Sequence, residues 1–323
     1  SSRAYGKLAA ELKELSGIDT GYAPTGGIIP CLGEAELEAR AQFIEKLRAE
    51  TEDGTYPASV LSRKELEGML PKVPFGPEVS GGIWSDMDGY VDPLHLMFAF
   101  RKSFVRLGGT LFAGERVSEV KPSGKGYAVV CGGRTLECGK AVLAAGLGVR
   151  KLAAQLGTDI PVFPNKSQVM LLERIPADVL PIPLLGIART FGGTVMIGAA
   201  HENMGMDRRL TPEVLAANAQ WAVRVWPELE RKRILRFWTG LRVWPKDAYP
   251  IYDRIPGHEN AFVFAMHSAV SLAAILEQAL PDYVMGKPLP PDGAIFGLSR
   301  FAGGGSGFQG SAASSPHAEA PNK

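Results

Sequence analysis

The sequence predicts a mixed α/β fold in which a parallel α/β layer is combined with a separate antiparallel-sheet domain. Lys140–Leu156 has the pattern of a buried strand, a Gly-Leu-Gly turn and an amphipathic helix. Between residues 161 and 249 the pattern changes to short strands separated by turn residues, which is typical of an antiparallel sheet. Ala261–Met266 is again a continuous apolar run, followed by a helical pattern. The chain therefore leaves the α/β layer and returns to it.

The strand-turn-helix at Lys140–Leu156 is the first candidate for a ligand site. Its strand, Lys140–Ala145, is apolar from Ala141 on without alternation, which predicts a parallel strand covered on both faces. Ligands of open α/β sheets lie at the carboxyl ends of strands, and the N–H groups at a helix start attract phosphate. A nucleotide site and an ordinary strand-turn-helix both explain the pattern, because the third glycine of a phosphate-binding turn is missing.

Composition excludes several classes of protein. The chain has 323 residues, 46% of them hydrophobic and 21% charged, and 35 basic against 34 acidic side chains give a net charge of +1. This balance argues against a nucleic-acid partner. No apolar run approaches the ~20 residues of a membrane span, and the N-terminus lacks the apolar core of a signal peptide, so we expect a cytoplasmic protein. Because the first residue is Ser1 and a helical pattern follows at once, we expect the N-terminus to be missing or processed.

The three cysteines are predicted to be reduced and to bind no metal. Cys131 and Cys138 lie in two short strand patterns, Tyr127–Cys131 and Arg134–Cys138, joined by a two-glycine hairpin turn. That turn pairs Cys131 with Arg134 and leaves the two sulfurs roughly 13 Å apart, which is too far for a disulfide. No Cys-x-x-Cys motif and no His at metal-ligand spacing accompany them.

The rest of the chain contains several predicted helices with recognisable end residues. Helices are expected over Ser1–Ser16, Ala35–Thr51 and Leu61–Leu70, with Gly17 ending the first and Ser62 capping the third. Asp92 and Pro93 have the pattern of an N-cap and first helical residue, and Thr211 and Pro212 repeat it. The helix from Pro93 has one apolar stripe, which we expect to be buried: Leu94, Met97, Phe98, Phe104 and Val105.

Arg242 is the strongest candidate for a functional side chain. It lies in an apolar, aromatic strand pattern, 238–245, where a guanidinium is costly unless it is paired. A planar guanidinium holds a carboxylate with two hydrogen bonds, and the partner is either a substrate or an internal Asp or Glu. His201 and Glu202 are expected to be polar residues at a strand end. The sequence contains no Ser-His-Asp order, nucleophile elbow or Walker loop.

A series of segments resembles the D-amino-acid oxidase family of FAD-dependent oxidoreductases, which includes glycine oxidase, sarcosine oxidase and subunits of opine and hydroxyproline dehydrogenases. The resemblance runs in order from about Tyr5 to Phe301. It rests on GYVDP (89–93), GGTLFAGERVSEV (108–120), VLAAG (142–146), MIGAAHENMGMDRRLTPE (196–213), WTGLR (238–242), DAYPIY (247–252), MHSAVSLA (266–273) and SRF (299–301).

The resemblance implies FAD as the cofactor and an amino acid or amine as the substrate. Arg242 matches the arginine that holds the substrate carboxylate. Val117 matches the position that contacts the adenine through its backbone. Positions matching the nucleotide strand end and the loop beside the flavin ring are Ala144, Ala145, Gly146, His267, Ser268, Val270, Ser271 and Leu272.

The resemblance also implies a division of the chain. Residues 93–160 and 252–301 would form a doubly wound FAD-binding layer, incomplete at its N-terminus. Residues 161–251 would form the antiparallel substrate domain, to which 1–92 would add helices and further elements. Residues 302–323 are low in complexity and are expected to be disordered.

Two departures from the family pattern matter. The family begins with a strand and a Gly-x-Gly-x-x-Gly turn that binds the pyrophosphate, and this chain contains no such segment. We expect it to precede Ser1 or to come from a partner subunit. The usual Arg-Gly-Gln is here Lys166-Ser167-Gln168, and the usual glycine-rich flavin loop is HSAVSLA.

The expected function is oxidation of the C–N bond of an amino acid or secondary amine, with hydride transfer to FAD. The alternative is a non-catalytic component or binding module of a flavoprotein complex that does not itself hold FAD. An NAD-dependent dehydrogenase is a third reading, which the missing dinucleotide fingerprint disfavours.

Overall fold

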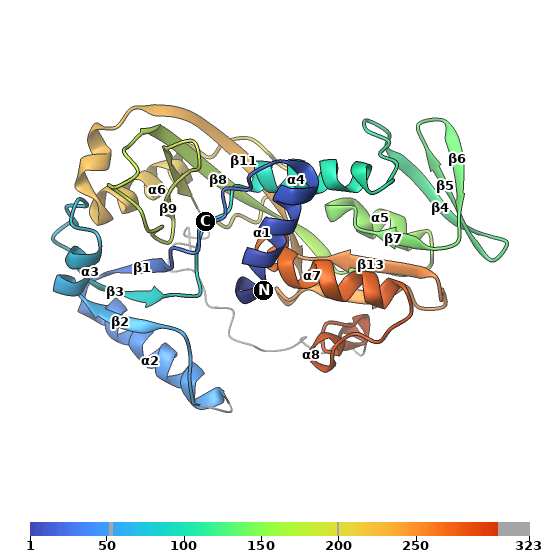
Figure 1. Cartoon of the computed structure of the whole chain (residues 1–323), viewed down its shortest axis with the longest axis horizontal. Coiled ribbons are helices and arrows are strands. Elements are labelled where there is room, and N and C mark those ends of the chain that lie inside the picture. The colour runs from blue at the N-terminus through green and yellow to red at the C-terminus, as the bar shows by residue number, and fades with distance from the viewer. Residues whose placement is uncertain (52–53, 199, 303–323) are drawn as a thin grey trace.

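The structure is a computed structural model that describes residues 1–51, 54–198 and 200–302, and Figure 1 shows its course. Two sheet-containing lobes lie side by side, and helices α1, α4 and α7 lie between and across them. The mixed α/β fold expected from the sequence is confirmed. The tail expected to be disordered lies outside the described residues from 303 on.

One lobe is built on a large antiparallel sheet. Its strands β8 (Val162–Arg174), β9 (Ile187–Arg189), β10 (Thr194–Gly198) and β11 (Ile234–Pro245) have the order β11-β8-β10-β9. A bridge between Ile28 and Leu184 joins them to β1 (Gly27–Leu32), β3 (Val79–Ser85) and β2 (Ser59–Ser62). These seven strands are called the large sheet. Around it lie α2 (Glu34–Glu50), α3 (Arg63–Met69), α6 (Pro212–Val225) and the short 3₁₀ helix η2 (Pro227–Arg231).

The other lobe contains the parallel element. Strand β7 (Ala141–Leu143) pairs in parallel with β13 (Ala261–Ala265), which pairs on its other side with β12 (Ile251–Arg254). The turn after β7 is the 3₁₀ helix η1 (Gly146–Gly148), and α5 (Val149–Ala154) follows. A three-stranded meander lies beside them, formed by β4 (Val117–Ser123), β5 (Gly126–Cys131) and β6 (Arg134–Cys138). Its predicted register is confirmed, since Cys131 pairs with Arg134 and Tyr127 with Cys138, and all three cysteines are free.

Helices α1 (Ser2–Ser16), α4 (Pro93–Arg106) and α7 (Ala269–Val284) pack together, and α8 (Pro291–Ala294) and η3 (Leu298–Phe301) follow α7. The predicted caps at Asp92, Ser62 and Gly17 form as expected, whereas the side chain of Thr211 makes no capping bond to α6. The Asp92 carboxylate accepts the N–H groups of Leu94 and His95, and Ser62 forms a capping box with Glu65. Gly17 ends α1 at a φ of 70°, which is a conformation that favours glycine.

The predicted buried face of α4 is wrong. Leu94 is 61% exposed and Phe98 47%, and Met97, Phe104 and Val105 are also exposed. The helix instead buries a narrower face of Leu96, Ala99 and Ser103, because α1 packs against that side. The broad apolar stripe therefore has no cover among the described residues.

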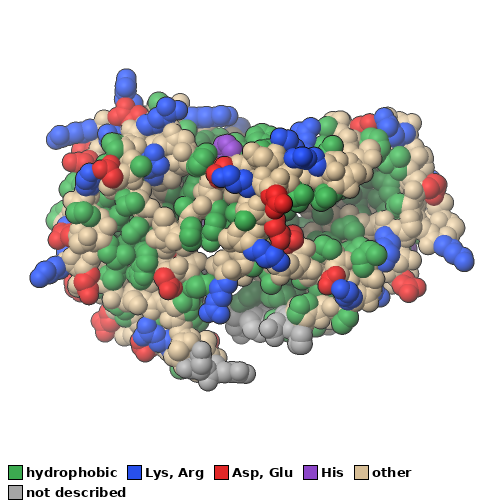
Figure 2. All heavy atoms as spheres, in the orientation of Figure 1, with side chains coloured by type: hydrophobic (Ala, Val, Ile, Leu, Met, Phe, Trp, Pro, Cys, Tyr) green, Lys and Arg blue, Asp and Glu red, His purple; other side chains and the backbone are tan. Residues whose placement is uncertain are grey.

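The prediction that Lys140–Ala145 is covered on both faces is also wrong. Ala141 and Leu143 are buried, whereas Val142 is 45% exposed. In the described part of the chain β7 pairs only with β13, so its other edge is open. The hollow in the right-hand lobe of Figure 2 has apolar side chains on its walls. One face and one edge of the parallel layer are thus uncovered.

Candidate functional site

Arg242 lies on β11 and is partly buried at the centre of a polar cluster. Its Nη2 donates to Ser167 Oγ at 2.9 Å. Its Nη1 donates to the Ala200 carbonyl at 3.1 Å and lies 2.9 Å from Nδ1 and 3.2 Å from Nε2 of the His201 ring. No Asp or Glu of the described residues lies within ion-pair distance of it. Burial lowers the pKa of the guanidinium. The internal carboxylate left open by the sequence is therefore absent from this part of the structure.

His201 is the main site residue that the sequence did not predict. Its Nδ1 lies 3.0 Å from Asn165 Oδ1 of β8 and donates to it, which leaves Nε2 as the acceptor for Arg242 Nη1. Burial, followed by the charge of Arg242, lowers its pKa to about 4. Because a guanidinium can only donate, His201 must accept from Arg242 and is neutral at neutral pH.

Trp244 lies between His201, beside Arg242, and His267, in the loop expected beside the flavin. The indole stacks on His267 with ring centroids 4.4 Å apart and meets His201 edge-on at 5.2 Å. His267 Nε2 donates to the Ala248 carbonyl at 2.8 Å, so its Nδ1 accepts the hydroxyl of Ser268 at 2.6 Å. Burial lowers the pKa of His267. One indole therefore separates two neutral imidazoles.

The residues matched to the nucleotide-binding strand end line a cavity in the other lobe, separate from the Arg242 cluster. Val117, Ala144 and Ala145 line a space of about 430 Å³ that extends along β7 from Lys140 to its carboxyl end. Gly146 follows with a φ of 57° and lies against Val243. A cavity at the end of a parallel strand suits the flat part of a nucleotide. No described residues form a glycine turn opening a long helix for the pyrophosphate, so the fit to FAD is partial.

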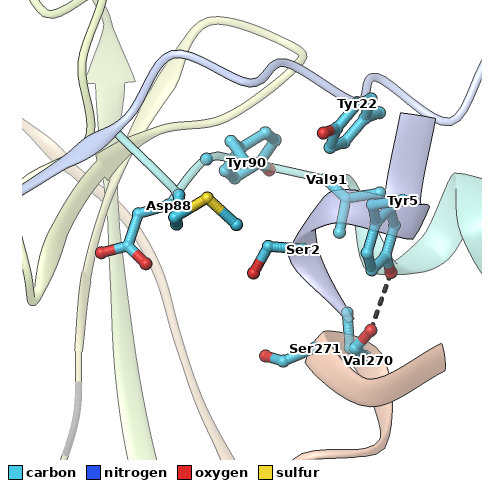
Figure 3. A pocket seen from close by; sticks show the side chains of 10 residues that line it. Ser2, Tyr5, Tyr22, Asp88, Tyr90, Val91, Val270 and Ser271 are labelled. Carbon is cyan, nitrogen blue, oxygen red and sulfur yellow. Dashed lines mark hydrogen bonds between the residues drawn. The ribbon is translucent and has the colours of Figure 1, made fainter. Parts of the chain in front are cut away.

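The loop at 267–272 is divided between two surroundings. His267 stacks on Trp244 and is bonded to the Ser268 hydroxyl. Val270 and Ser271 instead line a cavity of about 160 Å³ together with three tyrosines, Tyr5, Tyr22 and Tyr90 (Figure 3). Tyr5 donates its hydroxyl to the Val270 carbonyl at 2.7 Å, and burial raises its pKa to about 12. Leu272 lies within α7, where its N–H bonds to the Ser268 carbonyl. Helix α1 thus fixes the start of α7.

Metal-ligand clusters and membrane-spanning helices are both absent from the described residues. No group of three or more His, Cys, Asp or Glu side chains in these residues could hold a metal ion. Within the same part of the chain, no helix is long and apolar enough to cross a membrane.

Comparison with known proteins places this geometry in a family. Residues 1–276 match the family model described as "DAO: FAD dependent oxidoreductase". The chain is 32% identical over 302 residues to a subunit of the opine oxidase of Agrobacterium tumefaciens (strain Ach5), covering 93% of this chain and 80% of that protein. It is 25% identical over 303 residues to glycine oxidase of Geobacillus kaustophilus (strain HTA426), covering 92% and 79%.

Solved structures agree on the fold. The crystal structure of glycine oxidase from Geobacillus kaustophilus superposes with a TM-score of 0.85 at 24% identity, covering 94% of this chain and 82% of that one. L-Proline dehydrogenase from P. horikoshii superposes with a TM-score of 0.77 at 20% identity, covering 91% and 80%. The family model spans most of the chain, as does a relative above 30% identity. The chain therefore belongs to the DAO family of FAD-dependent oxidoreductases.

Proposed function

We propose that this chain forms the substrate-binding part of an FAD-dependent enzyme that oxidises the C–N bond of an amino acid or secondary amine. The observation that supports this most is Arg242, a partly buried guanidinium without a carboxylate among the described residues. A cation in that position is costly unless an anion reaches it. A carboxylate next to the substrate nitrogen is the natural anion for a member of this family.

The neighbouring side chains would orient that carboxylate. Ser167, Ala200 and His201 accept hydrogen bonds from the N–H groups of Arg242 and so fix the orientation of the guanidinium plane. The substrate nitrogen loses its proton before oxidation, and bound FAD would supply the acceptor of the hydride. Trp244 and His267 form a flat wall beside the guanidinium that limits access of water to it. The protein's part is thus mainly orientation and exclusion of water.

The residues proposed to hold FAD are four at the carboxyl end of β7 and its cavity, and the loop at 267–272. Val117, Ala144, Ala145 and Gly146 would contact the nucleotide, and His267 to Leu272 would lie beside the flavin ring. In this division 93–160 and 252–301 serve the cofactor, whereas 161–251, with elements of 1–92, serves the substrate.

A further polypeptide segment, in the same chain or in a partner protein, is proposed to complete the FAD site. The open edge of β7 and the uncovered stripe of α4 support it. The edge presents unpaired backbone groups of the kind that a further strand pairs with, and the stripe is an apolar surface of the kind that another element covers. The opine oxidase relative is itself named as one subunit of that oxidase, which supports a partner protein as the source.

The alternative is a non-catalytic component that keeps the carboxylate site and holds no flavin. Anaerobic mixing of glycine, sarcosine, L-proline or iminodiacetate with the FAD-loaded protein, assembled with its completing segment, separates the two functions. Bleaching of the flavin absorbance by at least one of them, lost in Arg242→Ala and kept in Arg236→Ala, supports the enzyme. Arg236 is the matched control because it lies on the same strand with an exposed side chain. A protein that binds these compounds but never acquires flavin supports the alternative.

A further inference from the structure

A second polar cluster lies on the opposite face of β8 from Arg242. Lys166, Gln168, Glu202 and Thr211 form it, and the side chains of Lys166 and Glu202 are only 1% and 8% exposed. Lys166 Nζ lies 3.1 Å from Glu202 Oε2 and donates to Thr211 Oγ1 at 2.7 Å. Thr211 Oγ1 donates to Glu202 Oε2, and Gln168 Nε2 to Glu202 Oε1, both at 2.7 Å. Each carboxylate oxygen therefore has at least one donor.

The cluster also fixes the start of α6. Thr211 occupies the predicted N-cap position, but its side chain makes no capping bond to the helix. The hydroxyl is instead shared between Lys166 and Glu202, and the Thr211 N–H donates to Gln168 Oε1 at 2.9 Å.

The cluster and the Arg242 site share the same two stretches of backbone. Lys166 and Glu202 exchange two backbone hydrogen bonds of 2.9 Å. Side chains alternate along an extended chain, so the neighbours of these two residues point the other way. Those neighbours are Ser167 and His201, the side-chain partners of Arg242. A displacement of Glu202 would therefore move His201, and a displacement of Lys166 would move Ser167.

We propose that the Lys166–Glu202 pair, with Gln168 and Thr211, positions the partners of Arg242 for carboxylate binding. This inference rests on the proposed function of Arg242. A buried ion pair adds little net stability compared with apolar side chains of the same volume, but its hydrogen bonds are directional. None of the four residues touches the substrate. They act through Ser167 and His201, which hold the guanidinium plane.

The test is steady-state kinetics of the FAD-loaded enzyme, assembled with its completing segment and carrying Glu202→Gln. This change keeps the shape of the side chain and removes the charge opposite Lys166. We expect KM to rise about tenfold, with kcat within about twofold and the flavin spectrum unchanged, since misplacement lowers affinity before it affects the cofactor. Inhibition by acetate, a simple carboxylate probe, should weaken by the same factor. An unchanged KM and acetate inhibition constant would overturn the proposal.

A double variant, Lys166→Met with Glu202→Met, separates positioning from stability. Glu202→Gln leaves the Lys166 charge buried without its partner, which should lower the melting temperature. The double variant removes both charges together, so its melting temperature should return toward that of the parent enzyme. If the KM stays raised, the directional bonds are responsible. A KM that recovers together with the melting temperature overturns the proposal and leaves a purely structural role.

Glu78→Gln is the matched control. Glu78 forms an exposed ion pair with Arg224 of α6, so the same change there should alter neither KM nor acetate binding. Arg242→Ala keeps the two proposals apart. If it leaves KM unchanged, the proposed function itself fails. If it raises KM while Glu202→Gln does not, only the positioning role fails.

Discussion

Replacing Arg242 with alanine should remove most of the enzyme's affinity for the carboxylate in the transition state. A guanidinium has five N–H groups, and within the described residues three of them donate to Ala200, His201 and Ser167. This leaves the Nε–H and one N–H of Nη2, which form one edge of the guanidinium fork. Two hydrogen bonds to a charged group contribute about 1.5 to 3 kcal/mol each, so about 3 to 6 kcal/mol is at stake. That energy corresponds to a fall in kcat/KM of about 10² to 10⁴.

The assay is the rate of flavin reduction by substrate in the parent enzyme and in Arg242→Ala, Arg242→Lys and Arg236→Ala. Arg242→Lys keeps the charge without the planar fork, so its loss should be intermediate. Arg236→Ala should behave like the parent enzyme. The flavin spectrum should not change in any of them. A lowered melting temperature of Arg242→Ala with an unchanged kcat/KM would refute the reasoning, because it would assign Arg242 to the stability of the sheet alone.

Four further predictions concern the cofactor, the open face, pH and a cap. The polypeptide Ser1–Lys323 alone should bind FAD weakly or not at all and should aggregate, as measured by absorbance titration and light scattering; a yellow, monodisperse protein with sub-micromolar affinity would contradict this. Phe98→Glu should improve its solubility without lowering its melting temperature, because Phe98 is exposed, and should impair recovery of flavin binding when the completing segment is supplied. The contribution of His201 to the free energy of unfolding should be constant well above about pH 6.5 and fall as the pH drops toward 4, because the unfolded chain then binds a proton that folded His201, with its lowered pKa, does not; this slope should flatten in His201→Gln. Ser62→Ala should cost about 1 kcal/mol in urea denaturation by removing a capping box, and a loss below about 0.3 kcal/mol would mean that water replaces the cap.

Local rules determined much of what was predictable. The two-residue turn fixes the hairpin register, so the pairing of Cys131 with Arg134 followed from the sequence. The caps at Asp92 and Ser62 followed from residue type and position. The buried face of α4 was mispredicted because an apolar stripe indicates that a face packs against something, but does not identify the element that packs there.

The partners of Arg242 could not be predicted in the same way. The aromatic strand indicated a guanidinium with a special role, but Ser167 and His201 reach it only through the pairing of β11 with β8 and the course of the chain after β10. These pairings join positions far apart in sequence, and the side-chain period of two means that a one-residue slip would present Lys166 or Glu202 instead. Thr211 shows the same limit, since its hydroxyl serves a distant ion pair and not the helix that it precedes.

The parallel pairing of β7 with β13 has a consequence for the order in which the chain folds. Ala141 pairs with Ala261, and strands β8 to β11 lie between them in sequence. Closing so long a loop costs conformational entropy, and the three residue pairs of β7 and β13 offset little of that cost, so this pairing forms slowly. The hairpin of β5 and β6 closes only a short loop and forms early. During synthesis β7 leaves the ribosome long before its partner exists. We therefore expect the large sheet to form first, and β7 to remain a site for chaperones until the last third of the chain has emerged.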